Sequence, residues 1–168
     1  MQAPPSYSSR LRELGFVSSS ESIGYIGVGE WRQSGQFFVA RMVVDVAEGD
    51  KIKERSYWLK CPYDFWCNLD DVVRKRVDIA RRLRSFGCNV PVTEWFEPAT
   101  MIQEEVRGRT VETDRGAIPN YAREPIRREM ELYELAGYRF MDGVSGNFII
   151  DDQGKAWCID LDLNKVGS

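Results

Sequence analysis

FMDGVSGNFIIDDQGKAWCIDLD, residues 140–162, is the stretch on which the fold prediction for this chain depends. Residues 148–150 and 156–159 are apolar runs with high strand propensity, and the Asp-Asp-Gln-Gly sequence between them is typical of a turn. The stretch therefore predicts a β-hairpin. Because a hairpin brings its two ends together, we expect Asn147, before the first strand, to lie beside Asp160, after the second.

A third polar residue, Asp142, precedes the hairpin on the loop that leads into it. Two carboxylates and one amide that converge at a strand end form a site for a hard cation such as Mg²⁺, which prefers oxygen ligands and shares its coordination shell with phosphates. Taken singly, Asp and Asn next to strands are usually turn formers or helix caps. It is the combination of the three that predicts a magnesium site.

The order Asp, four residues, Asn, hairpin and Ile-Asp resembles the catalytic loop and metal-binding segment of the protein-kinase-like superfamily, especially its aminoglycoside and small-molecule phosphotransferase branch. This resemblance implies that Asp142 accepts the proton of the attacking hydroxyl, and that Asn147 and Asp160 hold Mg²⁺ against the phosphates of ATP. The chain departs from the family pattern at Phe140, where the family often has His, and at residues 161–162, where many members have Phe-Gly.

Residues 22–61 consist of three strand-like runs separated by turn sequences, which predicts an antiparallel meander. Lys60 lies near the end of the third run, and its apolar neighbours indicate a buried strand. By the resemblance, Lys60 contacts the nucleotide phosphates, and the turn that contains Ser34 and Gly35 covers them with backbone N–H groups.

A helix is predicted for residues 69–86, with an apolar stripe, acidic residues in its first turn and Gly87 at its end. Its many Arg and Lys residues indicate a solvated face rather than a nucleic-acid surface, because the chain has no basic excess elsewhere. In the family, a helix at this place presents an acidic residue to the Lys of the third strand. Asp78 is best placed for this role, and Asp71 is the alternative.

Two further strands are predicted, for residues 92–97 and 101–106. The second resembles the family's hinge between lobes, so that backbone groups from Glu104 to Val106 are expected to hydrogen-bond the adenine edge of ATP. After the hinge, the sequence predicts only one helix, at about 124–136, before the catalytic loop. The part of the family that binds the phosphate acceptor is mostly missing, and we expect a partner protein, a second copy of the chain or a large substrate to complete the cleft.

Composition narrows the function classes further. The chain has 168 residues, a formal net charge of −3 and no histidine, which excludes mechanisms that need imidazole and gives no reason to expect binding to nucleic acid or to an anionic membrane. No apolar run is long enough for a membrane span, and the start lacks a secretory signal, so a cytoplasmic protein is expected. The four cysteines have no paired spacing and are interpreted as reduced. They are Cys61, Cys67, Cys88 and Cys158.

Together these features predict an α+β, protein-kinase-like fold. Residues 1–21 are expected to be partly disordered, with one helical turn near Leu11. Residues 22–106 would form a nucleotide-binding lobe with a five-stranded antiparallel sheet and one helix, and residues 107–168 a reduced second lobe. The predicted function is ATP- and magnesium-dependent phosphoryl transfer to an unidentified hydroxyl.

Three alternatives stay open at this stage. A catalytically inactive kinase-like module would keep the fold and bind nucleotide or protein. A glycosyltransferase is suggested by the Asp-Leu-Asp sequence at residues 160–162, although the chain is short for one and lacks alternating strands and helices. A plain interaction module would bind no nucleotide.

Overall fold

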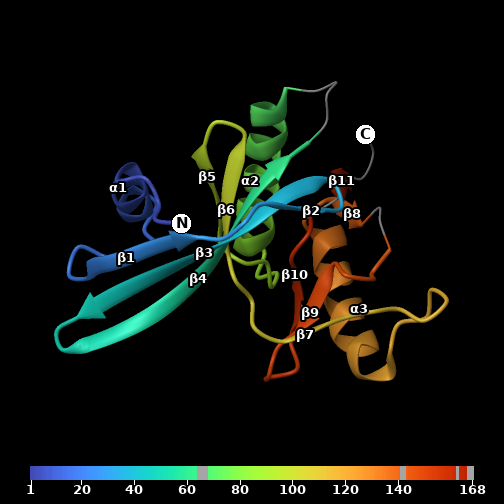
Figure 1. Ribbon diagram of the computed structural model, residues 1–168. Helices are drawn as coiled ribbons and strands as arrows, with labels where there is room; N and C mark the ends of the chain where they lie inside the picture. The colour runs from blue at the N-terminus through green and yellow to red at the C-terminus, as the bar shows by residue number, and fades with distance from the viewer. Residues whose placement is uncertain (64–67, 141–142, 162, 166–168) are drawn as a thin grey trace. The chain divides into compact units, whose positions relative to one another are not determined.

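The computed structural model describes residues 1–63, 68–140, 143–161 and 163–165. The fold is α+β with a mostly antiparallel sheet, as the sequence predicts in general terms (Figure 1). The chain divides into two compact units. The first comprises Met1–Arg74 with Thr93–Glu105, and the second comprises Lys75–Val92 with Val106–Ser168. No helix in the described part of the chain is long and apolar enough to cross a membrane.

The first unit is built on a six-stranded sheet in which every neighbouring pair is antiparallel. Its main path runs in the order β1-β3-β4-β6-β5, and β2 pairs with β3. The strands are β1 (Ser22–Val28), β2 (Arg32–Ser34), β3 (Phe37–Glu48), β4 (Lys51–Pro62), β5 (Thr93–Glu97) and β6 (Thr100–Glu104). The predicted meander is confirmed. The sixth strand arises because residues 32–34, which the sequence assigned to a turn, form β2 and pair with β3.

Along β3 and β4, buried side chains alternate with more exposed ones, so one face of these long strands packs into a hydrophobic core. Met42 in β3, Leu59 in β4 and Ile102 in β6 are fully buried, and Leu59 pairs directly with Ile102 in the register of the central strand. In place of the predicted single turn, α1 (Ser6–Glu13) extends over eight residues. Its Leu11 is also fully buried. The expected partial disorder of residues 1–21 stays a prediction.

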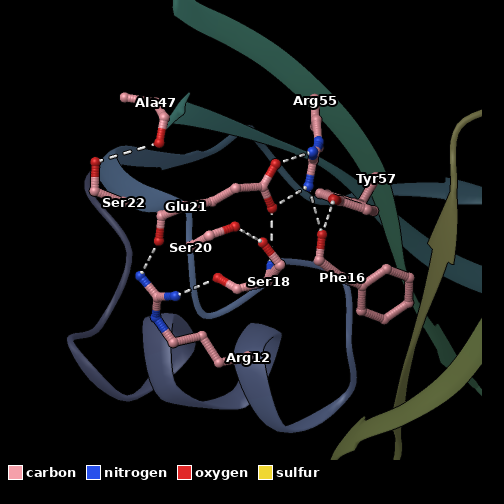
Figure 2. A network of polar contacts seen from close by, with 9 residues as sticks. All are labelled: Arg12, Phe16, Ser18, Ser20, Glu21, Ser22, Ala47, Arg55 and Tyr57. Carbon is pink, nitrogen blue, oxygen red and sulfur yellow. Dashed lines mark hydrogen bonds and ion pairs between the residues drawn. The ribbon is translucent and has the colours of Figure 1, made fainter. Parts of the chain in front are cut away.

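A polar network ties the segment after α1 to the sheet (Figure 2). The guanidinium of Arg55 in β4 donates to the carbonyl of Phe16 at 2.7 Å and to the carboxylate of Glu21 at 3.1 Å. Arg12 donates to the carbonyls of Ser18 and Glu21, at 2.7 Å each. Hydrogen bonds from the backbone N–H of Ser18 and from Arg55 hold the pKa of Glu21 below its ordinary value. The network therefore fixes this connection through backbone carbonyls, which a sequence pattern does not reveal.

The second unit contains α3 (Asn120–Leu135) and two small sheets. One sheet has the order β10-β9-β7 and the other pairs β11 with β8. These strands are β7 (Arg109–Thr110), β8 (Tyr138–Phe140), β9 (Phe148–Ile150), β10 (Ala156–Cys158) and β11 (Leu163–Lys165). Helix α3 begins at Asn120, four residues before the predicted start. Pro125 therefore lies inside the helix, not in its first turn, and the buried Ala122 precedes it.

Helix α2 (Leu69–Ser85) confirms the prediction for residues 69–86, and Gly87 follows it with a φ of 82°. The predicted lobe boundary is less accurate. The sequence assigned all of residues 22–106 to one lobe, whereas residues 75–92 group with the second unit. The reason is burial, since the apolar residues of this segment belong to the same core as α3, β9 and β10. They are Ile79, Ala80, Leu83, Cys88 and Val90.

Candidate functional site

The predicted hairpin is present, and its turn is held by one carboxylate. Strands β9 and β10 pair antiparallel between residues 148–150 and 156–158. In the turn, Asp151 accepts hydrogen bonds from the backbone N–H groups of Gln153 and Lys155, at 2.9 Å each, and from the indole of Trp157 at 2.8 Å. Burial alone would raise the pKa of Asp151, but these hydrogen bonds outweigh it and hold the pKa below its ordinary value.

The open end of the hairpin brings Asn147 next to the residues that follow β10, as the sequence predicts. The backbone N–H of Ile159 donates to the carbonyl of Asn147 at 3.0 Å, which continues the ladder one step past the strands. The side-chain Nδ2 of Asn147 donates to the carbonyl of Gly143 at 2.7 Å. This bond orients the amide and leaves Oδ1 as the atom that can contact a ligand.

Asp160 lies directly after Ile159 and faces a cation from α2. Its Oδ1 lies 3.7 Å from a guanidinium nitrogen of Arg76. The side chain of Arg76 is 13% exposed and that of Asp160 is 38% exposed. The basic residues of this helix were predicted to lie on a solvated face, which is wrong for Arg76. Helical periodicity contains the signal that was missed, because Arg76 falls on the stripe of Val73, Val77 and Ala80.

The chemistry of this end of the hairpin fits Mg²⁺ in its donor atoms. The amide oxygen of Asn147 and the carboxylate of Asp160 are hard oxygen ligands, and Mg²⁺ commonly takes one or two protein ligands together with water and phosphate oxygens. Within the described ranges, no three or more Cys, Asp or Glu side chains are grouped so that they could hold a metal ion. The third predicted group, Asp142, lies outside the described residues, as does Asp162.

The remaining predicted residues are distributed over both units. Lys60 is half-buried in the central strand β4, between Val39 of β3 and Met101 of β6, as expected for a Lys in an interior strand. Ser34 is exposed at the end of β2, and Gly35 is exposed in the turn that follows, with a φ of 57°.

Of the predicted hinge residues, Glu104 is exposed at the end of β6 in the first unit and Val106 begins the second. Asp78 is exposed on α2 within the second unit. The structure thus brings together Asn147 and Asp160. The pairing of Asp78 with Lys60 and the contacts of residues 104–106 with adenine stay predictions.

A buried carboxylate that no sequence pattern predicted supports the hairpin from α3. Glu129 is 4% exposed and accepts hydrogen bonds from the backbone N–H of Asn89, at 2.9 Å, and from its side-chain amide, at 2.8 Å. The carbonyl of Asn89 in turn accepts a hydrogen bond from the N–H of Cys158 in β10, at 3.2 Å. Burial raises the pKa of Glu129 above its ordinary value. Asn89 therefore links α3 to the strand that ends at the candidate site.

Replacing Glu129 with alanine should destabilise the second unit by about 2–4 kcal/mol, because two donors of Asn89 lose their acceptor and a space opens beside Tyr133. Hydrogen exchange of the β9 and β10 amides measures the loss. Glu131→Ala is the matched control, since Glu131 lies two residues further along α3 with an exposed side chain. It should change stability by no more than about 0.5 kcal/mol.

The raised pKa of Glu129 also predicts a pH dependence. The unfolded chain releases this proton near the ordinary Glu value of about 4.3, whereas the folded chain retains it to higher pH. Stability should therefore fall as the pH rises from that value through the raised native pKa, and Glu129→Gln should remove this component.

Equal exchange rates in Glu129→Ala and Glu131→Ala would show that the buried carboxylate does not support the hairpin.

Comparison of the sequence with protein-family models and with curated proteins found no match to either.

Proposed function

We propose that this protein is an ATP- and magnesium-dependent phosphotransferase. The observation that carries the proposal lies at the open end of the hairpin, where the backbone N–H of Ile159 donates to the carbonyl of Asn147. The side-chain amide of Asn147 and the carboxylate of Asp160 therefore belong to the same end of the hairpin. Asp142 precedes this end by five residues in the sequence. Two hard oxygen ligands next to a general base are the groups that phosphoryl transfer from a magnesium nucleotide requires.

In the proposed reaction, a hydroxyl oxygen of the acceptor attacks the γ-phosphorus of ATP, the bond to the bridging oxygen of ADP breaks, and the hydroxyl proton passes to the carboxylate of Asp142. Asn147 and Asp160 would hold Mg²⁺, which neutralises charge on the phosphates when bound. By the resemblance, Lys60 would contact phosphate oxygens, Ser34 and Gly35 would offer backbone N–H groups, and residues 104–106 would bind adenine.

The order of the elements along the chain supports this proposal. An antiparallel meander precedes a helix and two further strands, and Lys60 lies in the central strand of the sheet. The acceptor is a hydroxyl of a protein or a small molecule.

A second candidate is a nucleotide-binding module without transfer activity. The observation that favours it is the ion pair between Arg76 and Asp160, because a guanidinium already neutralises one of the two metal ligands. An interaction module of this type would use the same units without moving phosphate.

Incubation of the chain with γ-labelled ATP, with and without Mg²⁺, tests the proposal. We expect slow, magnesium-dependent release of labelled phosphate even without an acceptor, because water can replace the hydroxyl in the site. Binding of ATP without release would favour the second candidate. Absence of both binding and release would overturn the two together.

A further inference from the structure

We propose that Glu129 is a positioning residue for Asp160, to which a buried chain of hydrogen bonds connects it. The chain runs through Asn89 and Cys158, and deprotonation of the Glu129 carboxyl tightens it. The inference concerns the geometry of the hairpin end, and it rests on the proposed function only where Asp160 is taken as a metal ligand.

The chain begins at the carboxyl group of Glu129, whose two oxygens accept hydrogen bonds from the same residue. Oε2 accepts from the backbone N–H of Asn89 at 2.9 Å, and Oε1 accepts from its side-chain amide at 2.8 Å. Glu129 is 4% exposed, so water hardly competes for these oxygens. Two donors on two different oxygens match a carboxylate, because a protonated carboxyl uses one of its oxygens as a donor.

Asn89 transmits this constraint to the second strand of the hairpin. Its carbonyl accepts a hydrogen bond from the backbone N–H of Cys158 at 3.2 Å. Cys158 is fully buried, and its Sγ donates to the carbonyl of Asp160 at 3.1 Å. The residue between them, Ile159, donates its N–H to the carbonyl of Asn147. The backbone of Asp160 is therefore held at its own carbonyl and at the preceding residue, which fixes the direction of its side chain.

Protonation of Glu129 weakens the first link of the chain, because hydrogen bonds to an ionised carboxylate are roughly twice as strong as bonds between neutral groups. The titratable groups around this carboxyl are Cys88 before β5, Tyr133 on α3 and Cys158 on β10, whose thiol is the donor in the chain. Burial raises the pKa of Cys88 to about 11 and also raises the pKa of Tyr133. Both groups stay neutral at lower pH, where Glu129 titrates.

The pH dependence separates this positioning role from support of the fold. Burial raises the pKa of Glu129, so the folded state loses stability as the pH rises through that pKa. A merely structural role would therefore weaken the hairpin end at high pH. The positioning role predicts the opposite at the site, because the carboxylate form holds Asn89, and through it Asp160, more tightly.

Nuclear magnetic resonance of the labelled chain without any ligand tests the chain of hydrogen bonds itself. The carbonyl carbon signal of Asp160 reports the bond from Cys158, and the carboxyl carbon signal of Glu129 reports its titration. We expect both signals to shift with one midpoint, above the ordinary Glu pKa of about 4.3. Glu129→Gln should remove this component from the Asp160 signal, and Glu131→Gln, at an exposed position of α3, should keep it. Different midpoints, or a component that survives in Glu129→Gln, would overturn the proposal.

Binding of Mn²⁺, a spectroscopic substitute for Mg²⁺, then connects the chain to the proposed site. The free Mn²⁺ signal in electron paramagnetic resonance gives the affinity in the presence of ATP. Compared with Glu129→Gln at the same pH, the wild type should bind about 3- to 10-fold more tightly above the midpoint and equally well below it. Affinity that instead falls with stability as the pH rises would overturn the positioning role.

Two variants of Cys158 test the last link by the same measurement. Cys158→Ala removes the donor to Asp160 and should lower the affinity for Mn²⁺ with ATP about 3- to 10-fold, whereas Cys158→Ser keeps a donor there and should restore it. Equal losses in the two variants would overturn the chain. A wild type that binds no Mn²⁺ with ATP would overturn the proposed function, and the ligand-free titration of the Asp160 signal would still decide the positioning role.

Discussion

Replacing Asp160 with alanine should abolish the stabilisation that Mg²⁺ and ATP together give the wild-type chain. In the proposed site, Asp160 is the charged member of the ligand pair, and Asn147 alone would offer a neutral oxygen, which is a weak magnesium ligand. At a ligand concentration of about 100 times Kd, binding stabilises the folded state by about 2.7 kcal/mol. For a chain of this size, this corresponds to a rise in Tm of roughly 5–10 °C. Thermal unfolding with Mg²⁺ and ATP, each alone and combined, measures it.

Two variants control for effects on folding. Asp152→Ala removes the same side chain from the turn at the other end of the hairpin, where Asp152 is exposed, and it should keep the joint shift. Asp160→Asn keeps the shape of the side chain beside Arg76 and should lose the shift as Asp160→Ala does. If Asp160→Ala retains the wild-type shift, the carboxylate is not a ligand and the candidate site is wrong.

Asp142→Asn should lower the rate of phosphoryl transfer by roughly 10²–10⁴-fold and leave the binding of magnesium and ATP almost unchanged. Asparagine has the shape of aspartate but cannot accept the proton of the attacking hydroxyl. The expectation depends on the sequence spacing and the family resemblance, since Asp142 lies outside the described residues. Release of label from γ-labelled ATP gives the rate, and the thermal shift gives the binding.

The rate in Asp152→Asn, which makes the same chemical change in the hairpin turn, should equal that of the wild type. Transfer at the wild-type rate in Asp142→Asn would remove this residue from the mechanism. Loss of both transfer and binding would instead assign Asp142 to the metal site rather than to proton transfer.

The hairpin could be predicted because its determinants are local. The turn sequence contains both the residue that accepts the turn's hydrogen bonds, Asp151, and a glycine with positive φ, Gly154. The apolar runs on either side match the observed strands to within one residue. Neighbouring residues thus decide both the strand pairing and the meeting of Asn147 with the end of β10. The meander and α2 were predictable for the same reason.

Two charged contacts of the second unit were not predictable, because each joins residues far apart in the sequence. Arg76 meets Asp160, and Glu129 meets Asn89. In a sequence, a charged residue next to apolar positions is normally assigned to solvent. Whether such a residue is buried is decided only when its helix packs against the rest of the unit. The assignment of residues 75–92 to the second unit has the same origin, since it depends on which core receives Ile79 and Leu83.

Adenine recognition and the identity of the acceptor could not be predicted from the sequence for a different reason. The expected contacts of residues 104–106 use backbone groups, which every residue carries. No predicted element of this chain has a pattern from which the acceptor could be inferred.

The central claim is that a metal nucleotide binds where Asn147 and Asp160 meet. Nuclear magnetic resonance of the labelled chain with a non-hydrolysable ATP analogue and substoichiometric Mn²⁺ tests this most directly, because the paramagnetic ion broadens nearby signals first. We expect the amide signals of Asn147, Ile159 and Asp160 to broaden before those of the turn residues 152–155. Broadening that begins at the turn or away from the hairpin, or no broadening at all, would contradict it.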